Sequence, residues 1–269
     1  MDTKLTGKTR IESDLIGARE IPAEALYGVQ TLRGIENFSI SKFRLSEYPL
    51  FIKGLAITKM AAAMANFELG LLTVEQKDAI IAACGEILDG KHHDQFPVDM
   101  IQGGAGTTTN MNANEVIANR ALELMGYERG EYQYCSPNDH VNCSQSTNDA
   151  YPTAIHIGMY FKHLQLLPHL EELIASFRKK GEEFSQIIKM GRTQLEDAVP
   201  MTLGQTFNGF ASILQDEIAH LNEAAADFLV VNMGATAIGT GICAEPGYAE
   251  KCIAALREIT GWDIRLSSD

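Results

Sequence analysis

The sequence predicts a mainly α-helical protein, and three observations support this fold class. Residues 51–70, which read FIKGLAITKMAAAMANFELG, are rich in Ala, Leu and Met and end in a glycine. Two longer segments, 155–180 and 203–228, carry apolar residues at helical spacing. Other segments with the same spacing are followed by the glycines that commonly end helices: Gly90, Gly126 and Gly261.

The shorter elements follow from their start and stop signals. Residues 1–50 look irregular, with short β-prone pieces such as FSISKF. Thr73 with Gln76 forms a candidate capping box for the next helix. Asn110 is the candidate N-cap of a helix that ends at Gly126. The last predicted helix, YAEKCIAALREIT, ends at Gly261.

The two long segments predict a helix bundle. Pro168 is expected to kink the first of them. A helix of about 30 residues spans roughly 45 Å, and helices of that length usually bury their apolar stripe against other long helices. This chain supplies two, so further helices are expected from other subunits or further sequence. We predict an N-terminal, mostly helical domain at 1–140 and an incomplete central long-helix bundle domain at 141–269.

Composition narrows the classes of partner. A formal net charge of -13 argues against a nucleic-acid-binding surface. No apolar run reaches the roughly 20 residues of a membrane span, and the N-terminal residues lack the apolar segment of a signal peptide. The five cysteines are odd in number and include no C-x-x-C pattern, which favours reduced thiols and a cytoplasmic location. We therefore expect no nucleic acid, no membrane and a small-molecule ligand.

Three polar loops carry the candidate site: residues 103–110, 144–148 and 191–197. Each is expected to precede a helix, and the helix after the third loop is expected to open at Pro200. One interpretation is simple capping, because Ser, Thr and Asn are common at helix starts. The other is an anion site, because several donors in a row exceed what one cap needs. Unpaired N–H groups at a helix N-terminus favour an anion.

Other candidate residues are given structural roles. His156, His163 and His169 lack the i, i+4 spacing of a zinc site, so no metal site is predicted. His140 is expected to be structural. Glu115 and Arg120 are expected to be surface or inter-helix charges. The glycine-rich residues 234–241 lack the ending of a phosphate-binding P-loop and are expected to form a tight crossing between long helices.

Several motifs resemble those of one known family. QGGAGTTTNMNANEVIANRA, SPNDHVNCSQSTNDAYPTA and KMGRTQLEDAVPMTLGQ are similar to segments of the aspartase/fumarase superfamily, most closely of its aspartate-deaminating members, as are EALYGVQTLR and NMGATAIGTG. The resemblance implies the aspartase/fumarase fold, with a small N-terminal domain and a long-helix bundle domain. It also implies a homotetramer whose active sites are each built from three subunits.

The resemblance further implies a lyase that converts L-aspartate reversibly to fumarate and ammonia. A base removes a proton next to the β-carboxylate, which then carries a second negative charge that hydrogen-bond donors stabilise. The positions matched to substrate binding are Thr107, Ser146 and Thr147 at this carboxylate, Asn148 at the amino group, and Thr193 and Gln194 in the third loop. Fumarases carry His where Gln194 stands, which favours aspartate. The alternatives are a class II fumarase and an inactive helical assembly fragment.

Two departures from the family pattern stand out. Cys143 occupies a position where many relatives have Lys. The family's flexible Gly-Ser-Ser-x-x-Met-Pro-x-Lys-x-Asn loop, whose serine is the catalytic base, is absent from these 269 residues. We therefore expect an N-terminal portion that holds substrate-binding donors and is inactive alone. The implied chemistry needs no cofactor, and the sequence leaves activation by a divalent cation open.

Overall fold

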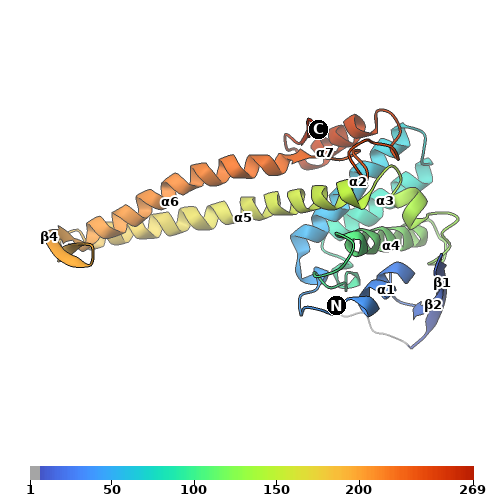
Figure 1. The fold of residues 1–269 in the computed structure, drawn as a ribbon, viewed down its shortest axis with the longest axis horizontal. Helices are drawn as coiled ribbons and strands as arrows, with labels where there is room; N and C mark the ends of the chain where they lie inside the picture. Colours follow the sequence, from blue (N-terminus) through green and yellow to red (C-terminus); the bar gives the residue numbers. More distant parts are fainter. Residues whose placement is uncertain (1–6) are drawn as a thin grey trace. The chain divides into compact units, whose positions relative to one another are not determined.

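The computed structural model describes residues 7–269, which divide into two compact units. The first consists of the chain up to residue 159 together with 229–269, and the second of residues 160–228. Figure 1 follows the chain through both. The expectation of domains at 1–140 and 141–269 stays a prediction from the sequence. Helices dominate both units, so the predicted fold class is confirmed.

The first unit begins with an antiparallel hairpin of β1 (Thr9–Asp14) and β2 (Gly17–Pro22), in which Thr9 pairs with Pro22. Helix α1 (Val29–Asn37) follows. Arg10 ties the hairpin to the chain after it, since its guanidinium donates to Glu12 Oε1 at 2.6 Å and to Tyr27 O at 2.9 Å.

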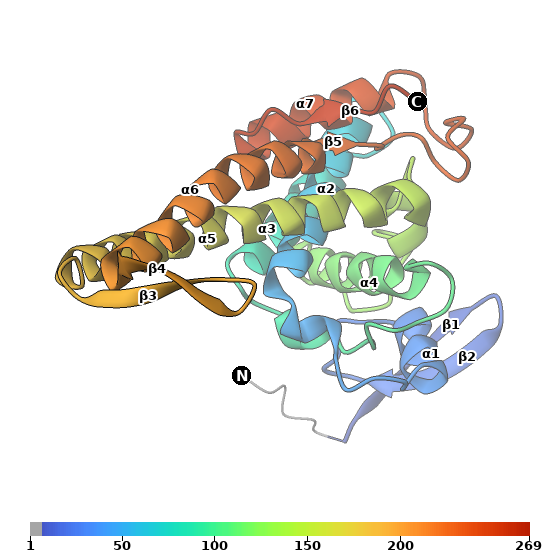
Figure 2. The same ribbon diagram turned by 60° about the vertical axis from the view of Figure 1, so that its left-hand side comes forward.

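The core of the first unit lies between four helices. Helix α2 (Pro49–Glu68) packs against α3 (Val74–Leu88) and α7 (Tyr248–Thr260), and α3 packs against α4 (Thr107–Leu124). Figures 1 and 2 show α7 alongside α2. Two-residue strands β5 (Val230–Val231) and β6 (Arg265–Leu266) pair in parallel beside α7. The largest apolar side chains in this core include Leu55, Ile80, Ile87, Ile117 and Leu122.

Helix α2 is apolar enough by composition, and at 20 residues long enough, to cross a membrane. Its most apolar stretch is 67% buried inside the unit. Gly54 allows α2 to touch the start of α5, since a side chain there would collide with the carbonyl of Ala154. The apolar composition of α2 thus reflects packing on several sides.

Helix α5 (Thr147–Glu183) runs unbroken through Pro168, and its predicted kink stays a prediction. Its residues from 160 onward form the second unit with the hairpin β3 (Ile188–Thr193)–β4 (Glu196–Thr202) and with α6 (Leu203–Ala226). The two long helices lie side by side in Figures 1 and 2. Between them, the rings of Phe177 and Phe207 pack with their centroids 5.9 Å apart.

Several predicted helix boundaries are confirmed and two are wrong. Thr73 and Gln76 form the full capping box, and Gly261 ends α7 in the left-handed conformation. Asn110 is not an N-cap: α4 starts three residues earlier, so Asn110 faces the buried interior. Pro200 does not open a helix but lies in β4, and α6 starts after Thr202.

The glycine-rich residues 234–241 do not mediate a crossing between long helices, which corrects that expectation. Gly234 lies against Ala249 of α7, and a side chain at Gly234 would come within 2.7 Å of the Ala249 methyl carbon. Gly239 and Gly241 adopt positive φ angles in an irregular segment, where Ile238 and Ile242 are exposed.

Candidate functional site

The first polar loop meets the start of α5 at Gly106. This residue precedes α4 with φ of 90°, and a side chain there would lie 2.6 Å from the ring of Tyr151. A glycine is therefore required both for its backbone conformation and for the close approach. Thr107 follows, exposed, and its hydroxyl donates to Gly104 O at 2.6 Å. In this arrangement the Thr107 hydroxyl hydrogen is used within its own loop.

The second loop caps α5 with Ser146. The Ser146 hydroxyl oxygen accepts from the backbone N–H of Asn148 at 3.2 Å and from its side-chain amide at 3.1 Å. In return, Asp149 Oδ1 accepts from Ser146 N at 2.9 Å. This reciprocal pattern satisfies helix-start donors, so capping is confirmed for Ser146.

Thr147 is not used in this cap. Its hydroxyl oxygen accepts from Asn110 Nδ2 at 3.2 Å, a contact between the starts of α5 and α4. Among the described residues, no acceptor engages the Thr147 hydroxyl hydrogen. A hydroxyl has one donor and two acceptor positions, so Thr147 keeps its donor for another partner.

A cavity of about 410 Å³ lies where the two loops meet. Thr147 and Asn148 line it, while Thr107 and Ser146 adjoin lining residues in the chain without lining it themselves. The structure thus gathers four of the predicted site residues around two neighbouring helix N-termini. The full lining is Met100, Gln102, Ala105, Gly106, Thr147, Asn148, Tyr151 and Pro152.

Two non-glycine residues in these loops have left-handed backbone angles. Ala105 has φ of 49° and Ser144 has φ of 60°. Such conformations cost free energy for residues with a side chain and are found more often at functional sites. Their occurrence in the first and second loops agrees with a site at this place.

A buried network of amide side chains contacts Thr147, which lines the cavity. The sequence did not predict this network. Lys59 of α2 has no exposed surface, and its ammonium donates to Asn110 Oδ1 at 2.7 Å, Gln145 Oε1 at 2.8 Å and Asn142 Oδ1 at 3.0 Å. Burial lowers the pKa of Lys59 to about 7, and the nearby charge of Asp149 partly opposes this effect. The Ala- and Met-rich residues around Lys59 in the sequence do not indicate that it is buried.

Asp149 anchors a distant segment to the second loop. Its side chain is fully buried, and Oδ2 accepts from Gly234 N and Thr236 N, both at 3.0 Å. Asn232 Nδ2 also donates to Asn148 O at 3.1 Å. Burial raises the pKa of Asp149, while the backbone donors favour its charged form. Residues 232–236 are therefore fixed beside the candidate site.

The third predicted loop is a hairpin turn, which corrects the expectation that it precedes a helix. Thr193 and Gln194 are exposed at the turn between β3 and β4, in the second unit. Gln194 and Leu195 have φ of 47° and 68°, as a tight hairpin turn requires. Their convergence with the other four residues stays a prediction.

The other structural expectations have mixed outcomes. Glu115 is not a surface charge, because it is 1% exposed and accepts from three backbone N–H groups at the start of α1. Its inter-helix role is confirmed, and burial raises its pKa to about 7. The ring of His140 accepts from Ser136 N at 2.7 Å, a structural contact. Within residues 7–269, no three His, Cys, Asp or Glu side chains are grouped to hold a metal ion.

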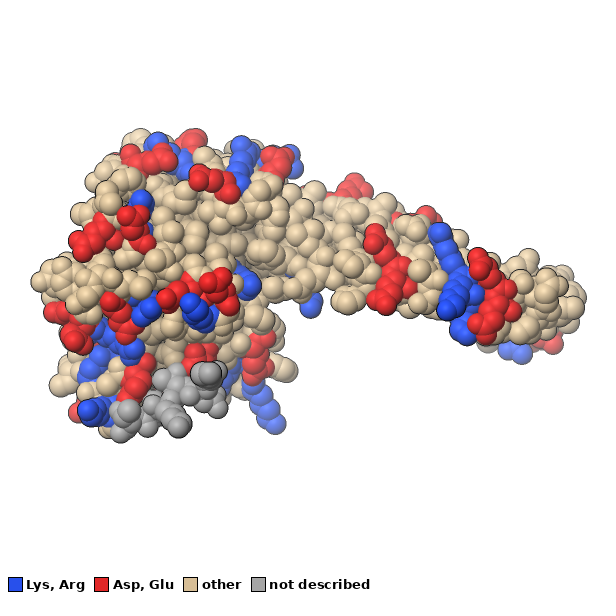
Figure 3. Space-filling view, turned by 180° about the vertical axis from the view of Figure 1, so that it is seen from behind, with Lys and Arg blue, Asp and Glu red and all other residues tan. Residues whose placement is uncertain are grey.

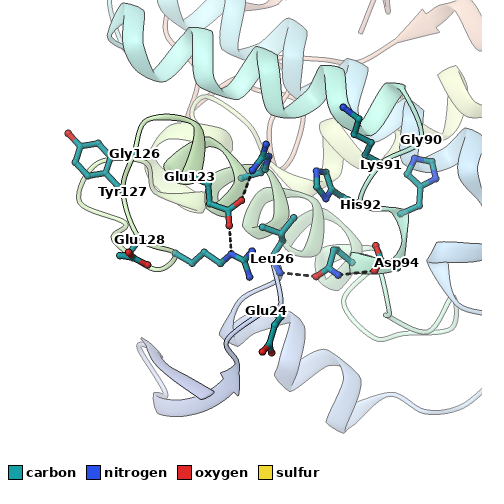
Figure 4. Close-up of a pocket in the computed structure, with 14 residues that line it drawn as sticks. Glu24, Leu26, Gly90, Lys91, His92, Asp94, Glu123, Gly126, Tyr127 and Glu128 are labelled. Carbon is teal, nitrogen blue, oxygen red and sulfur yellow. Dashed lines mark hydrogen bonds and ion pairs between the residues drawn. The ribbon is translucent and has the colours of Figure 1, made fainter. Parts of the chain in front are cut away.

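A larger cavity, of about 1000 Å³, lies elsewhere in the first unit (Figure 4). Glu123 accepts from Arg120 at 2.7 Å and from Arg129 at 2.6 Å, and Arg120 also pairs with Glu86. These guanidinium groups are neutralised by carboxylates of the same unit, so they present little net charge to a ligand. On the face in Figure 3, Lys and Arg are likewise interspersed with Asp and Glu.

Comparison with known proteins gives an independent view. The sequence model of a family described as lyase matches residues 17–267. The aspartate ammonia-lyase of Pseudomonas canavaninivorans is 55% identical over 261 residues, which cover 97% of this chain and 55% of that protein. The chain therefore spans about half the length of the curated relatives it matches.

Solved structures show the same fold. The cobalt-bound crystal structure of a fumarate lyase:delta crystallin from Brucella melitensis superimposes with a TM-score of 0.95 at 52% identity, covering 97% of this chain and 57% of that one. A class II fumarase from Schistosoma mansoni gives a TM-score of 0.88 at 36% identity, covering 94% of this chain and 53% of that one.

Proposed function

Because the chain belongs to the lyase family, we propose that it forms part of an enzyme that converts L-aspartate reversibly to fumarate and ammonia. The cavity between the starts of α4 and α5 holds the substrate's β-carboxylate. The observation that carries this proposal is that Thr147 and Asn148 line a cavity beside two helix N-termini. Helix N-termini favour anions, and neutral donors suit a group whose negative charge grows during the reaction.

Each site residue then has a proposed role. Thr147 donates its hydroxyl hydrogen to the carboxylate, and the Thr107 and Ser146 hydroxyl groups turn from their present partners toward it when the ligand arrives. Asn148 contacts the amino group. These donors stabilise the dianionic carboxylate that forms when the neighbouring carbon loses its proton.

Thr193 and Gln194 complete the site from another copy of the chain, near the amino group and the second carboxylate. We propose a cytoplasmic homotetramer in which the long helices of several copies form one bundle. The support is the number of large apolar side chains that are 41% or more exposed on α5 and α6, including Leu164, Leu166, Leu173, Phe210 and Ile213. Such side chains on facing helices are buried in bundles.

The second candidate function is that of a class II fumarase, which adds water to fumarate within the same fold. The compared fumarase is 36% identical, against 55% for the compared aspartate ammonia-lyase. Gln194 also stands where fumarases carry His. Both observations favour aspartate as substrate.

Fumarate formation, followed by ultraviolet absorbance, distinguishes the two reactions. The protein that contains this chain is supplied with L-aspartate and, in parallel, with malate. The proposal predicts fumarate from aspartate and little from malate. Fumarate from malate alone would establish the fumarase reaction, and no turnover or binding of either acid would leave a helical assembly role.

A further inference from the structure

We propose that Lys59 is a positioning residue, which sets the direction of a hydrogen-bond relay through Asn110 to Thr147 and so holds the Thr147 hydroxyl as a donor toward the ligand. This proposal rests on the proposed function and adds to it a residue that does not itself touch the substrate. All three side chains belong to the first compact unit.

The relay begins with the ammonium group, which can only donate. Lys59 has three N–H donors, and three amide oxygens lie within 2.7–3.0 Å of it, those of Asn110, Asn142 and Gln145. Since an ammonium repels an amide NH₂, it fixes which end of each amide faces inward. The outward direction of each NH₂ group follows.

The orientation of the Asn110 amide in turn determines which groups its N–H donors reach. Its Oδ1 faces Lys59, so its two N–H donors point to Asn142 Oδ1 at 3.1 Å and to Thr147 Oγ1 at 3.2 Å. Because Thr147 accepts from Asn110, its own hydrogen points elsewhere, and the residue lines the cavity. With the Asn110 amide reversed, Oδ1 would accept the Thr147 hydrogen and the ligand would lose a donor.

The Asn110→Asp variant reverses the relay and keeps a partner for the buried Lys59 ammonium, although it replaces the donor to Asn142 Oδ1 with an acceptor. A carboxylate pairs with the buried Lys59 ammonium, and its oxygens can only accept. The Thr147 hydroxyl would therefore donate to residue 110. The added negative charge also repels an anionic ligand, so a charge control is needed.

Asn114→Asp is that control. Asn114 lies one helical turn further along α4 and also donates to Asn142 Oδ1, at 3.1 Å, so the same charge enters the same network without touching Thr147. A second pair of variants, Asn110→Asp and Asn114→Asp in a Thr147→Val background, removes the hydroxyl that the relay acts upon.

Fumarate is the probe, and its Kd is measured by calorimetry on the whole protein, with thermal unfolding as the check on folding. The relay predicts that Asn110→Asp weakens binding by about tenfold more than Asn114→Asp, as for the loss of one hydrogen bond to a charged group. The excess should disappear in the Thr147→Val background and persist with Thr147→Ser.

The other possible outcomes distinguish a failure of the relay from a failure of the proposed function. Equal losses for Asn110→Asp and Asn114→Asp, or an excess that survives Thr147→Val, would overturn the relay while leaving the proposed function intact. If the unaltered protein neither bound fumarate nor formed it from aspartate, the proposed function would fall, and the relay with it.

Discussion

Asp149 Oδ2 accepts a hydrogen bond from Thr236 N at 3.0 Å and so joins two segments that are 87 residues apart in the chain. The same carboxylate also accepts from Ser146 N and Gly234 N. One buried group thus holds both the cap of α5 and the glycine-rich segment beside the candidate site.

The Asp149→Asn variant should be destabilised. An amide has one acceptor oxygen and an NH₂ group. In the variant, the NH₂ group would face a backbone N–H that donates to the carboxylate in the unaltered protein, so this N–H would lose its acceptor. We expect a loss of about 2 kcal/mol, measured as the shift of the urea unfolding transition at fixed protein concentration. Asp78→Asn, whose carboxylate is 61% exposed, is the matched control and should shift it little. Equal shifts would show that the buried carboxylate is not needed.

Glu115→Gln should disrupt the attachment of α1. Glu115 accepts from Gly28 N and Gln30 N at 2.8 Å and from Thr31 N at 3.0 Å, using both carboxylate oxygens. Replacing one oxygen by NH₂ leaves at least one buried N–H without an acceptor, at a cost of roughly 1–3 kcal/mol. Hydrogen exchange at the start of α1 should accelerate. Glu68→Gln, at an exposed ion pair with Lys251, should leave that exchange unchanged.

Acid should weaken the first unit partly through Glu86. The Arg120 guanidinium, with help from His92, holds the pKa of Glu86 at about 2, below its ordinary value of 4.5. A carboxyl whose folded-state pKa is lowered contributes stability above pH 4.5 and loses it as pH falls toward 2. Stability measured between these values should therefore fall less steeply in Glu86→Gln than in the unaltered protein. Parallel curves would contradict the role given to this ion pair.

Fumarate binding should weaken as pH rises above about 7. Burial lowers the pKa of Lys59 to about this value, so the ammonium that orients Asn110 is present below it and lost above it. The groups that influence this lysine are Asp149 on α5, whose nearby charge favours the ammonium form, and Cys84 and Cys252 on α3 and α7, whose pKa values of about 12 keep them neutral. Calorimetry across pH 6–9, a range of about three units around this pKa, measures the effect. A pH-independent Kd would argue that Lys59 does not change its charge there.

The sequence was most informative where structure depends on neighbouring residues. The capping box of Thr73 and Gln76 and the stop at Gly261 are local features, and both predictions are confirmed. Ser146 and Thr147 were also placed correctly at a helix start. In each case a few adjacent side chains determine the backbone conformation.

Predictions failed where contacts between residues far apart in the chain determine the local structure. The sequence around Asn110 is typical of an N-cap, but its side chain is buried and accepts a hydrogen bond from the ammonium of Lys59, which is 51 residues away in the chain. Pro200 looks like a helix start but lies in a strand, because β3 pairs with β4 and the capping box of α6 begins at Thr202. Nothing in the residues around Lys59 or Asp149 shows that they are buried, so the network behind the cavity could be found only from the structure.

The central claim is that the Thr147 hydroxyl donates a hydrogen bond to a bound dicarboxylate, in addition to its structural place at the start of α5. Calorimetric titration with fumarate of the unaltered protein, Thr147→Val and Thr73→Ala tests it most directly, because Thr73 is a helix cap outside the candidate site. The account predicts a Kd about tenfold higher for Thr147→Val and an unchanged Kd for Thr73→Ala. The same Kd in all three proteins would contradict it.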